Sequence, residues 1–210
     1  MHFFRIPSWL QLLCPSVVWH GSRDDKQVFL TFDDGPVPGI TDFVLEELAK
    51  WNMKATFFMV GENVSRHPGL AREVVAMGHG IGNHTYNHLN GVNTDATTYL
   101  QNVALCQEQL AQNLGVVPAL FRPPYGRLTA YQRRTLRESY EIVLWEILSG
   151  DYLDRLPEDL ICRKIQEKTR SGSIVLFHDQ EKTARKVKKV LPDYLAFLDG
   201  EGFQVKPLEV

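Results

Sequence analysis

Two pairs of side chains in this 210-residue chain could together hold a metal ion. Asp33 and Asp34 follow an apolar run and precede a Gly-Pro step. His84 and His88 have the spacing at which two residues share one face of a helical turn, so both imidazoles can bind one cation. Two imidazoles and a carboxylate that leave coordination positions open are typical of a catalytic, zinc-like site.

The pair Asp33-Asp34 can serve one site only if the strand that carries it is broken. Successive residues of a regular strand face opposite sides, so adjacent carboxylates would point apart. Gly35 and Pro36 break the strand, and we therefore expect the pair to turn toward a common point. Singly, both pairs are weak signals, because an Asp-Asp-Gly-Pro step is more often a turn and the histidines of a lone His-x-x-x-His are about as often structural.

Three further groups offer the other parts of a hydrolytic site. Two prolines stiffen the loop from Arg122 to Gly126, which can aim the Tyr125 backbone N–H at a substrate oxygen, while Arg122 can pair with a carboxylate. Trp145 and Asp151-Tyr152 come around the fifth predicted strand, and His178, at the end of the sixth, is a candidate acid or base. Each group also has a simpler interpretation. Arg122 could lie in a surface turn, His178 could be a structural histidine, and Trp145 could be a core residue.

Each group lies where a predicted strand gives way to a loop. Apolar, β-branched runs alternate with helical patterns along the chain. The predicted strands cover residues 27–33, 55–60, 80–83, 119–122, 141–147, 173–178 and 203–205. The predicted helices cover residues 41–51, 68–78, 95–114, 129–139 and 183–198, and a further helix begins at Pro157. Because ligands of parallel β/α folds collect at the carboxyl ends of the strands, we expect one cleft there.

The near-continuous apolar strands predict an α/β fold with a parallel sheet that helices cover. About seven β–α units favour a closed or nearly closed (β/α)7–8 barrel. An open doubly wound sheet is the alternative. The sequence has no internal repeat, low-complexity segment or linker, which indicates a single catalytic domain over residues 27–210.

The charge balance and the cysteines exclude several classes of protein. With a formal net charge of -2, the chain gives no reason to expect nucleic acid or an anionic membrane as a partner, and no obligate protein partner is evident. The basic residues between Lys182 and Lys189 are expected on a solvated helix face. Three scattered cysteines rule out a disulfide framework.

The first residues do not have the pattern of a secretory signal. Pro7, Gln11 and Pro15 interrupt the apolar run, and no small-residue cleavage site follows. No other stretch approaches the length of a membrane span. We therefore expect a cytoplasmic protein in which residues 1–26 form an N-terminal extension packed on the domain.

Taken in order, these groups resemble the motifs of the polysaccharide deacetylase family, the NodB-homology domain of carbohydrate esterase family four. The segments at residues 31–36, 82–88, 122–126 and 176–179 resemble its first, second, third and fifth motifs. The family usually has Asp-Trp in the fourth motif, where this chain has Asp151-Tyr152. The resemblance extends from about Gln27 to the C-terminus and implies a distorted barrel of the NodB-homology type.

The resemblance implies a metal site and a pair of groups that transfer protons. Asp34, His84 and His88 would bind one divalent ion, with Zn²⁺ as the default and Co²⁺, Ni²⁺ or Mn²⁺ as alternatives. Asp33 would act as the base that takes a proton from water. His178 would act as the acid that protonates the departing amine.

The remaining roles that the resemblance implies concern orientation and substrate contacts. Arg122 would orient the base, and Asp151 would tune the acid. Tyr125 would supply its backbone N–H to the oxyanion. Trp145 and Leu176 would form the walls of a small pocket for the acetyl methyl group.

The expected function is metal-dependent removal of N-acetyl groups, with O-acetyl groups as a variant, from an N-acetylglucosamine-type oligo- or polysaccharide. One alternative is a hydrolase of another carbon–nitrogen bond, in a cyclic imide, a ureide or a small amide, on the same scaffold. A second alternative is a non-catalytic carbohydrate-binding domain. The sequence leaves the polymer, the metal and the oligomeric state open.

Overall fold

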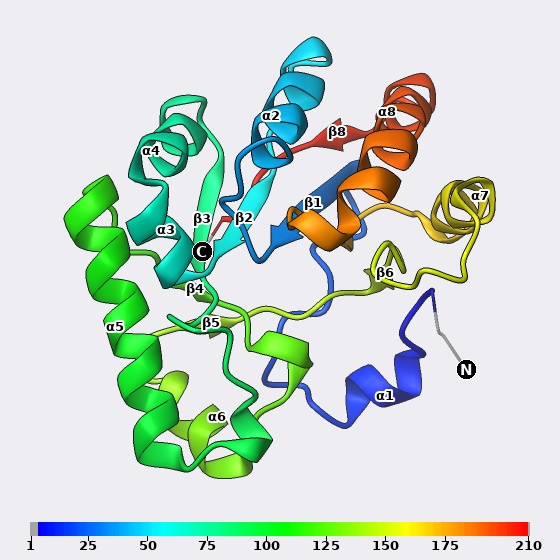
Figure 1. The fold of residues 1–210 in the computed structure, drawn as a ribbon. Coiled ribbons are helices and arrows are strands. Elements are labelled where there is room, and N and C mark those ends of the chain that lie inside the picture. The colour runs from blue at the N-terminus through cyan, green and yellow to red at the C-terminus, as the bar shows by residue number, and fades with distance from the viewer. Residues whose placement is uncertain (1–3, 210) are drawn as a thin grey trace.

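The computed structural model describes residues 4–209 and confirms the alternation of strands and helices (Figure 1). The strands are β1 (Gln27–Asp33), β2 (Thr56–Met59), β3 (Gly80–Asn83), β4 (Leu120–Phe121), β5 (Glu141–Ile142), β6 (Ile147–Leu148), β7 (Ser173–His178) and β8 (Gln204–Val205). The helices are α1 (Ser8–Leu12), α2 (Thr41–Lys50), α3 (Gly61–Arg66), α4 (Pro68–Ala76), α5 (Ala96–Leu114), α6 (Ala130–Leu136), α7 (Glu158–Lys168) and α8 (Ala184–Gly200). Short 3-10 turns, η1 (Gly91–Asn93), η2 (Pro124–Gly126) and η3 (Glu181–Thr183), lie in the connections.

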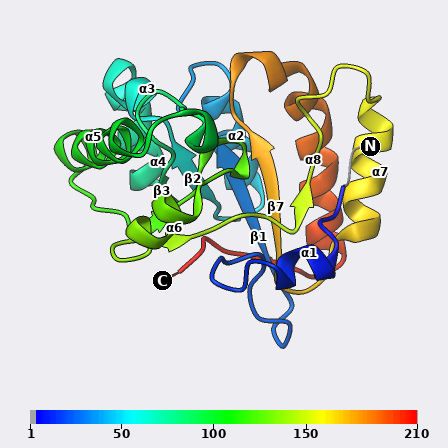
Figure 2. The same ribbon diagram turned by 90° about the horizontal axis from the view of Figure 1, so that it is seen from below.

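The strands form one parallel sheet that curls into a distorted barrel. Its order is β5-β4-β3-β2-β1-β7-β6, with β8 beside β1. The two ends of this order, β5 and β6, both belong to residues 141–148, so the sheet curls back almost onto itself. Helices surround the curled sheet (Figures 1 and 2). This arrangement confirms the predicted barrel and excludes the open doubly wound sheet.

The prediction of one continuous strand over residues 141–147 is wrong. Two short strands are present instead, and the backbone between them turns its carbonyls to other partners. Arg122 donates from Nε to the Val143 carbonyl (3.2 Å) and from Nη2 to the Leu144 carbonyl (2.9 Å). The interruption thus coincides with the guanidinium group that bonds to these two carbonyls, while Val18 bridges Val143 in parallel.

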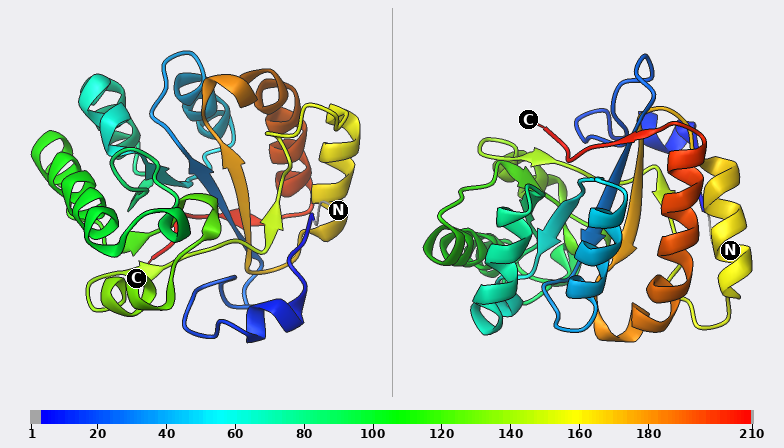
Figure 3. Two further views of the ribbon diagram at one scale, coloured as in Figure 1. Left: turned by 60° about the horizontal axis from the view of Figure 1, so that its bottom comes forward. Right: turned by 90° about the horizontal axis from the view of Figure 1, so that it is seen from above.

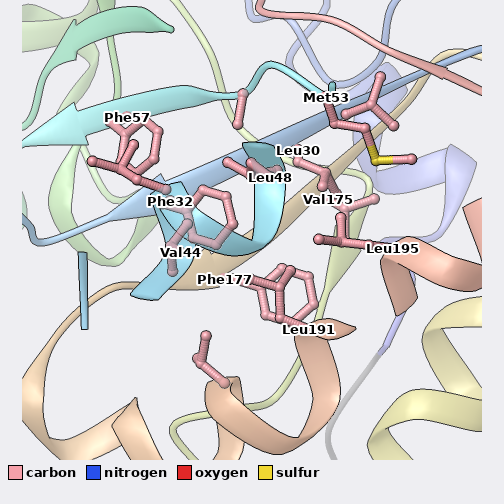
Figure 4. Packing of buried hydrophobic residues seen from close by; sticks show 14 of the residues in the cluster. Leu30, Phe32, Val44, Leu48, Met53, Phe57, Val175, Phe177, Leu191 and Leu195 are labelled. Atoms are coloured by element: carbon pink, nitrogen blue, oxygen red, sulfur yellow. The ribbon is translucent and has the colours of Figure 1, made fainter. Parts of the chain in front are cut away.

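Alternation along the strands separates a helix-facing core from the interior of the barrel. Leu30 and Phe32 of β1 belong to the main hydrophobic cluster with residues of α2 and α8. Figure 4 shows Phe32 close to Phe57 and Phe177, with ring centroids 5.1 and 5.9 Å apart. The intervening residue Thr31 faces inward, since its hydroxyl accepts a hydrogen bond from Arg122 (2.8 Å). Period-two patterning thus fixes which side chains can reach the interior.

Helix ends follow the expected capping chemistry, although short helices escaped prediction. The Asp95 side chain accepts from the Thr98 N–H at the start of α5, and Gly115 ends that helix in the left-handed region (φ 67°). Thr129 and Gln132 form a capping box at α6. Helices α1 and α3 were not predicted, because each is too short for an apolar period to show.

The segment before β1 lies along the curled sheet between α6 and α7 (Figures 1 and 3). Isolated bridges join Arg5 to Ile147, Val18 to Val143 and His20 to Ser173. Residues 1–3, the start of the predicted extension, lie outside the described residues. Among residues 4–209, no helix combines the length and the apolar character of a bilayer span.

Candidate active site

The predicted site residues meet at one cleft at the carboxyl ends of the strands. Eight of the ten line it: Asp33, Asp34, His84, His88, Tyr125, Trp145, Leu176 and His178. The other two, Arg122 and Asp151, are buried and hydrogen-bonded to residues of the cleft. The strand ends therefore bring together the groups that the sequence separates by more than 140 positions.

The two adjacent carboxylates reach the cleft because the strand ends between them. Asp33 is the last residue of β1 and is in register with His178, the last residue of β7. Asp34 has left the strand conformation, with φ of 84°. This conformation turns both carboxylates to one side, as the Gly-Pro break predicted.

Asp34, His84 and His88 form a metal-ligand cluster. Each offers one ligand atom, and these atoms lie within 4.8 Å of one another. Asp34 Oδ1 is 3.5 Å from His84 Nε2 and 3.0 Å from His88 Nε2. It is buried, and among the described residues no hydrogen bond reaches it. A buried carboxylate oxygen facing two imidazole nitrogens without a hydrogen bond fits a bound cation.

The surroundings prepare this cluster for a cation. His84 Nδ1 lies 2.7 Å from the Arg122 carbonyl, which leaves Nε2 for the cleft. Burial would raise the pKa of Asp34, but the His84 and His88 imidazoles outweigh burial and hold that pKa well below its usual value. An ionised carboxylate is the form that binds a metal.

The prediction that His84 and His88 lie on a helical turn is wrong. They belong to an irregular loop after β3, in which Thr85 and His88 have φ of 65° and 56°. The Asn83 side chain fixes the loop, since its Oδ1 accepts from the Thr85 N–H (2.9 Å) and its Nδ2 donates to the Val103 carbonyl (3.0 Å). The two histidines therefore converge through loop geometry.

Arg122 is fully buried beneath the cleft, so its interpretation as a surface-turn residue is excluded. Its Nη1 donates to Asp33 Oδ1 (2.7 Å), and its guanidinium carbon lies 4.1 Å from the centre of the Phe58 ring. Asp33 Oδ2 is left 3.7 Å from His84 Nε2, on the metal side. Arg122 thus holds one oxygen of Asp33 and leaves the other directed at the cluster.

His178 and Asp151 form the second ion pair of the site. His178 Nδ1 lies 2.8 Å from Asp151 Oδ1, and the His178 backbone N–H donates to Asp151 Oδ2 (2.7 Å). Burial would lower the pKa of His178, but the Asp151 carboxylate outweighs burial and raises it to about 9. With Nδ1 bound to Asp151, Nε2 is the nitrogen available to the cleft.

Aromatic and aliphatic side chains form the walls of the cleft. Tyr125 adopts a left-handed conformation (φ 61°), and its ring contacts the His88 ring edge-to-face at 4.8 Å. A Cβ atom at Gly126 would lie 2.9 Å from the Trp145 ring, so glycine permits this close packing. The Tyr152 ring lies 5.6 Å from the His178 ring, edge-to-face.

Several residues of the site were missed by sequence reasoning. The sequence placed Asp179 in a motif and assigned it no role. In the structure Asp179 is buried, and burial raises its pKa to about 8. Gln180, Arg127 and Lys182 also line the cleft. Lys182 is exposed, as expected, whereas Lys186 of the same basic group is buried, so the expectation of a solvated face is wrong for Lys186. Adjacency to His178 is the sequence signal that could have drawn attention to Asp179 and Gln180.

Comparison with known proteins gives a consistent set of similarities. The family model described as polysaccharide deacetylase matches residues 20–141. The chain is 35% identical to a peptidoglycan-N-acetylglucosamine deacetylase of Bacillus cereus, over 84% of this chain and 85% of that protein. It is 34% identical to a chitooligosaccharide deacetylase of Rhizobium leguminosarum bv. trifolii, over 74% and 73% of the two chains. The crystal structure of a peptidoglycan N-acetylglucosamine deacetylase superposes with a TM-score of 0.89 at 28% identity, covering 97% of this chain and 95% of that chain.

Proposed function

The chain belongs to the polysaccharide deacetylase family, and from that premise we propose how its cleft carries out deacetylation. It is a metal-dependent hydrolase that cleaves the carbon–nitrogen bond of N-acetyl groups on polysaccharides that contain N-acetylglucosamine. One observation carries this conclusion: the metal-ligand cluster of Asp34, His84 and His88 lies in the same cleft as Asp33 and His178.

The roles of the metal ligands and the base follow from their contacts. Asp34, His84 and His88 would hold the ion, which when bound supplies Lewis-acid activation of water and of the acetyl carbonyl. Asp33 takes a proton from the attacking water through Oδ2, because Arg122 already occupies Oδ1. Arg122 cannot swing away from this position, since it is fully buried.

The roles of the acid and of the oxyanion donor follow from the other side of the cleft. His178 donates a proton to the sugar nitrogen as the carbon–nitrogen bond breaks, so that the amine leaves in neutral form. Asp151 holds the imidazole through Nδ1 and keeps it protonated. The Tyr125 backbone N–H would donate to the oxyanion, a contact worth about 3–4 kcal/mol in comparable sites. Trp145 and Leu176 would enclose the acetyl methyl group.

We propose Zn²⁺ as the native ion. A set of two imidazoles and one carboxylate with open coordination positions suits zinc. The same donors accept Co²⁺, Ni²⁺ or Mn²⁺, because availability rather than affinity decides among such ions. Metal analysis of protein purified without added metal, followed by reconstitution of the stripped protein with each ion, tests this choice.

For the substrate, we propose a carboxylate-bearing chain of the peptidoglycan kind rather than a neutral chitin oligomer. Arg127 and Lys182 line the cleft, and among residues 4–209 neither forms an ion pair with a carboxylate. Cations around a cleft raise the local concentration of anionic substrates, an effect that salt screens. The double variant Arg127→Gln, Lys182→Gln should lower kcat/KM for anionic muro-oligosaccharides about tenfold and leave that for chitin oligomers unchanged. An equal loss on both substrates would contradict the choice.

No observation favours the alternatives of a hydrolase for imides, ureides or small amides, or of a non-catalytic binding domain. The metal ligands and both proton-transfer groups are present. Two expectations stay predictions. One is that residues 1–26 form an extension to a domain at 27–210. The other is that the protein is cytoplasmic, without a membrane or protein partner.

Acetate release is the direct test of the function. The purified chain with Zn²⁺ should release acetate from N-acetylglucosamine-containing oligomers, lose that activity on chelation and regain it on metal addition. Asp34→Asn and His84→Ala should lose metal and activity together. Acetate release that survives complete removal of the metal would contradict the proposal.

A further inference from the structure

The two residues after His178 contact the metal ligand Asp34 and the residue after it, and the mechanism above uses neither contact. The Gly35 N–H donates to Asp179 Oδ1 (3.0 Å). The Gln180 side-chain amide donates to Asp34 Oδ2 (2.5 Å). Both contacts join the residues after β7 to the turn after β1, beside the metal-ligand cluster.

The turn at Asp34 needs external support. Its φ of 84° is a conformation that non-glycine residues adopt only when their surroundings hold them there. The backbone gives part of this support: the Asp34 N–H donates to the Phe58 carbonyl (3.3 Å), and the Asn63 side chain donates to the Asp34 carbonyl (2.7 Å). These bonds fix the peptide before Asp34 and the carbonyl after it, and leave the side-chain direction open.

Asp179 fixes the other side of the turn. It is buried, with 1% of its surface exposed, and its Oδ2 accepts from the Thr41 hydroxyl (2.6 Å) at the start of α2. A Cβ atom at Gly35 would lie 2.0 Å from Asp179 Oδ2. The Asp179 carboxyl group therefore packs directly against the glycine that follows the metal ligand, and it ties that glycine to α2.

Gln180 fixes the direction of the Asp34 carboxylate. Its amide occupies Oδ2, while Oδ1 has no hydrogen bond among the described residues and faces the two imidazoles. Partial rotation of the carboxylate would break the bond to Gln180, and a half-turn would only exchange its two equivalent oxygens. The preferred rotamer is thus the one that directs Oδ1 at the metal position.

We propose that Asp179 and Gln180 are positioning residues that preset Asp34 as a metal ligand, Asp179 by fixing the backbone and Gln180 by fixing the carboxylate. The inference rests on the proposed function, because it assumes that a cation occupies the cluster. Residues that orient a metal ligand typically change metal affinity 10–100-fold when removed. His178, Asp179 and Gln180 would then couple the acid to the metal site through three consecutive residues.

Gln180→Leu tests the role of Gln180. Its Zn²⁺ dissociation constant, measured by competition with a chromogenic chelator on metal-free protein, should rise at least tenfold. The thermal midpoint of the metal-free protein should stay at the wild-type value. Gln112→Leu is the matched control, because Gln112 is an exposed glutamine on α5 whose amide bonds to Glu108, and its Zn²⁺ affinity should not change. A loss below tenfold for Gln180→Leu, or an equal loss in the control, would overturn its role.

A pair of variants tests Asp179. Asp179→Asn keeps an oxygen to accept from Gly35 and an amide to donate to Thr41, whereas Asp179→Ala removes both. Zn²⁺ should bind at least tenfold more weakly to Asp179→Ala than to Asp179→Asn. Equal affinities would overturn the role of Asp179. If Asp179→Ala does not fold, the comparison of Asp179→Asn with wild type decides: weakening by tenfold or more overturns the role, and retained affinity supports it.

The wild-type titration separates failure of this inference from failure of the proposed function. A wild-type protein that binds no Zn²⁺ would contradict both. A wild-type protein that binds Zn²⁺ and releases acetate, while Gln180→Leu binds with wild-type affinity, would contradict the inference alone.

Discussion

Two buried ionic groups lie at opposite ends of β7, and they differ in how completely their atoms are bonded. At the amino end, beside Ser173, the buried Glu146 carboxylate accepts hydrogen bonds from three guanidinium groups and the Ser173 hydroxyl. At the carboxyl end, beside His178, the buried Asp34 carboxylate leaves Oδ1 without a hydrogen bond among the described residues. A saturated group stabilises a fold, whereas an unsaturated one keeps a place for a ligand.

The arginine side chains at the two ends of β7 also differ in exposure. The three arginines around Glu146, which are Arg5, Arg23 and Arg170, are 30–45% exposed. Arg122, which donates to Asp33 beside Asp34, is fully buried. Glu146 does not line the cleft, whereas the Asp34 group does. Substitutions at the Glu146 group should therefore change stability without changing catalysis, and those at the cleft should change catalysis.

The largest effect is expected for Asp33→Asn. The amide oxygen can still accept from Arg122, so the thermal midpoint and the bound metal should stay close to wild type. The substituted side chain cannot take a proton from water, and kcat should fall by about 10²–10⁴-fold. Steady-state acetate release, metal analysis and thermal unfolding measure the three quantities. Full activity in this variant would refute the assignment of the base.

Glu146→Gln should lower the stability of the protein and leave its metal affinity almost unchanged. Three arginines lose their counter-charge, and although they can move toward water we expect a loss of about 3 kcal/mol, which lowers Tm by about 6–12 °C. The Zn²⁺ affinity should stay within about twofold of wild type. Thermal unfolding and chelator competition measure both. A loss of metal affinity without a loss of stability would contradict the assignment of the Glu146 group to stability.

The same group gives a pH dependence of stability. Burial would raise the pKa of Glu146, but hydrogen bonds from Arg23 and Arg170 outweigh burial and lower it from 4.5 to about 2. Because the folded-state pKa lies below the ordinary value, ionised Glu146 stabilises the fold above pH 4.5, and that contribution is lost as the pH falls from 4.5 through 2. Denaturant titrations across this range should show a steeper loss in wild type than in Glu146→Gln. Parallel curves would contradict the account.

Asp151→Asn should move the pH profile of catalysis. His178 must be protonated to act as the acid, and its pKa of about 9 keeps it so at neutral pH. Without the Asp151 charge, burial opposes only the Asp34 and Asp33 charges, and the pKa of His178 should fall. The alkaline limb of kcat/KM should therefore shift to lower pH, with little change in Tm. An unshifted limb would show that Asp151 does not control the acid.

Arg23→Gln should have the smallest effect. Two other arginines still bond to Glu146, so the loss should be about 1 kcal/mol in unfolding free energy, without an effect on acetate release. A loss of unfolding free energy as large as that of Glu146→Gln would mean that Arg23 alone provides the stabilisation at Glu146.

Sequence reasoning predicted the chemistry of the site better than its geometry. Short-range patterns identified the strand ends, the Asp33-Asp34 pair and the two histidines, because strand burial and the Gly-Pro break are local properties, and the family resemblance assigned Asp34 as the third ligand. The left-handed conformation of Asp34 was not predictable, since the Asn63 side chain that bonds to its carbonyl comes from another element. The direction of Asp34 Oδ1 likewise depends on Gln180, which is 146 positions away.

The Glu146 group was missed for the same reason. Its partners come from the segment before β1 and from the turn before β7, and a lone Glu in an apolar run gives no hint of them. The curl of the sheet brings them together. Contacts that depend on closure of the barrel are therefore the part of the structure that sequence patterns do not reveal.

Anomalous diffraction from a crystal grown with Zn²⁺ tests the central claim most directly. The account predicts one strong peak in the cleft, about 2.0–2.2 Å from an Asp34 oxygen and from Nε2 of His84 and of His88, with Asp33 close by and not replacing Asp34 as the ligand. A peak at other residues, or none in the cleft of a crystal whose protein releases acetate, would contradict it.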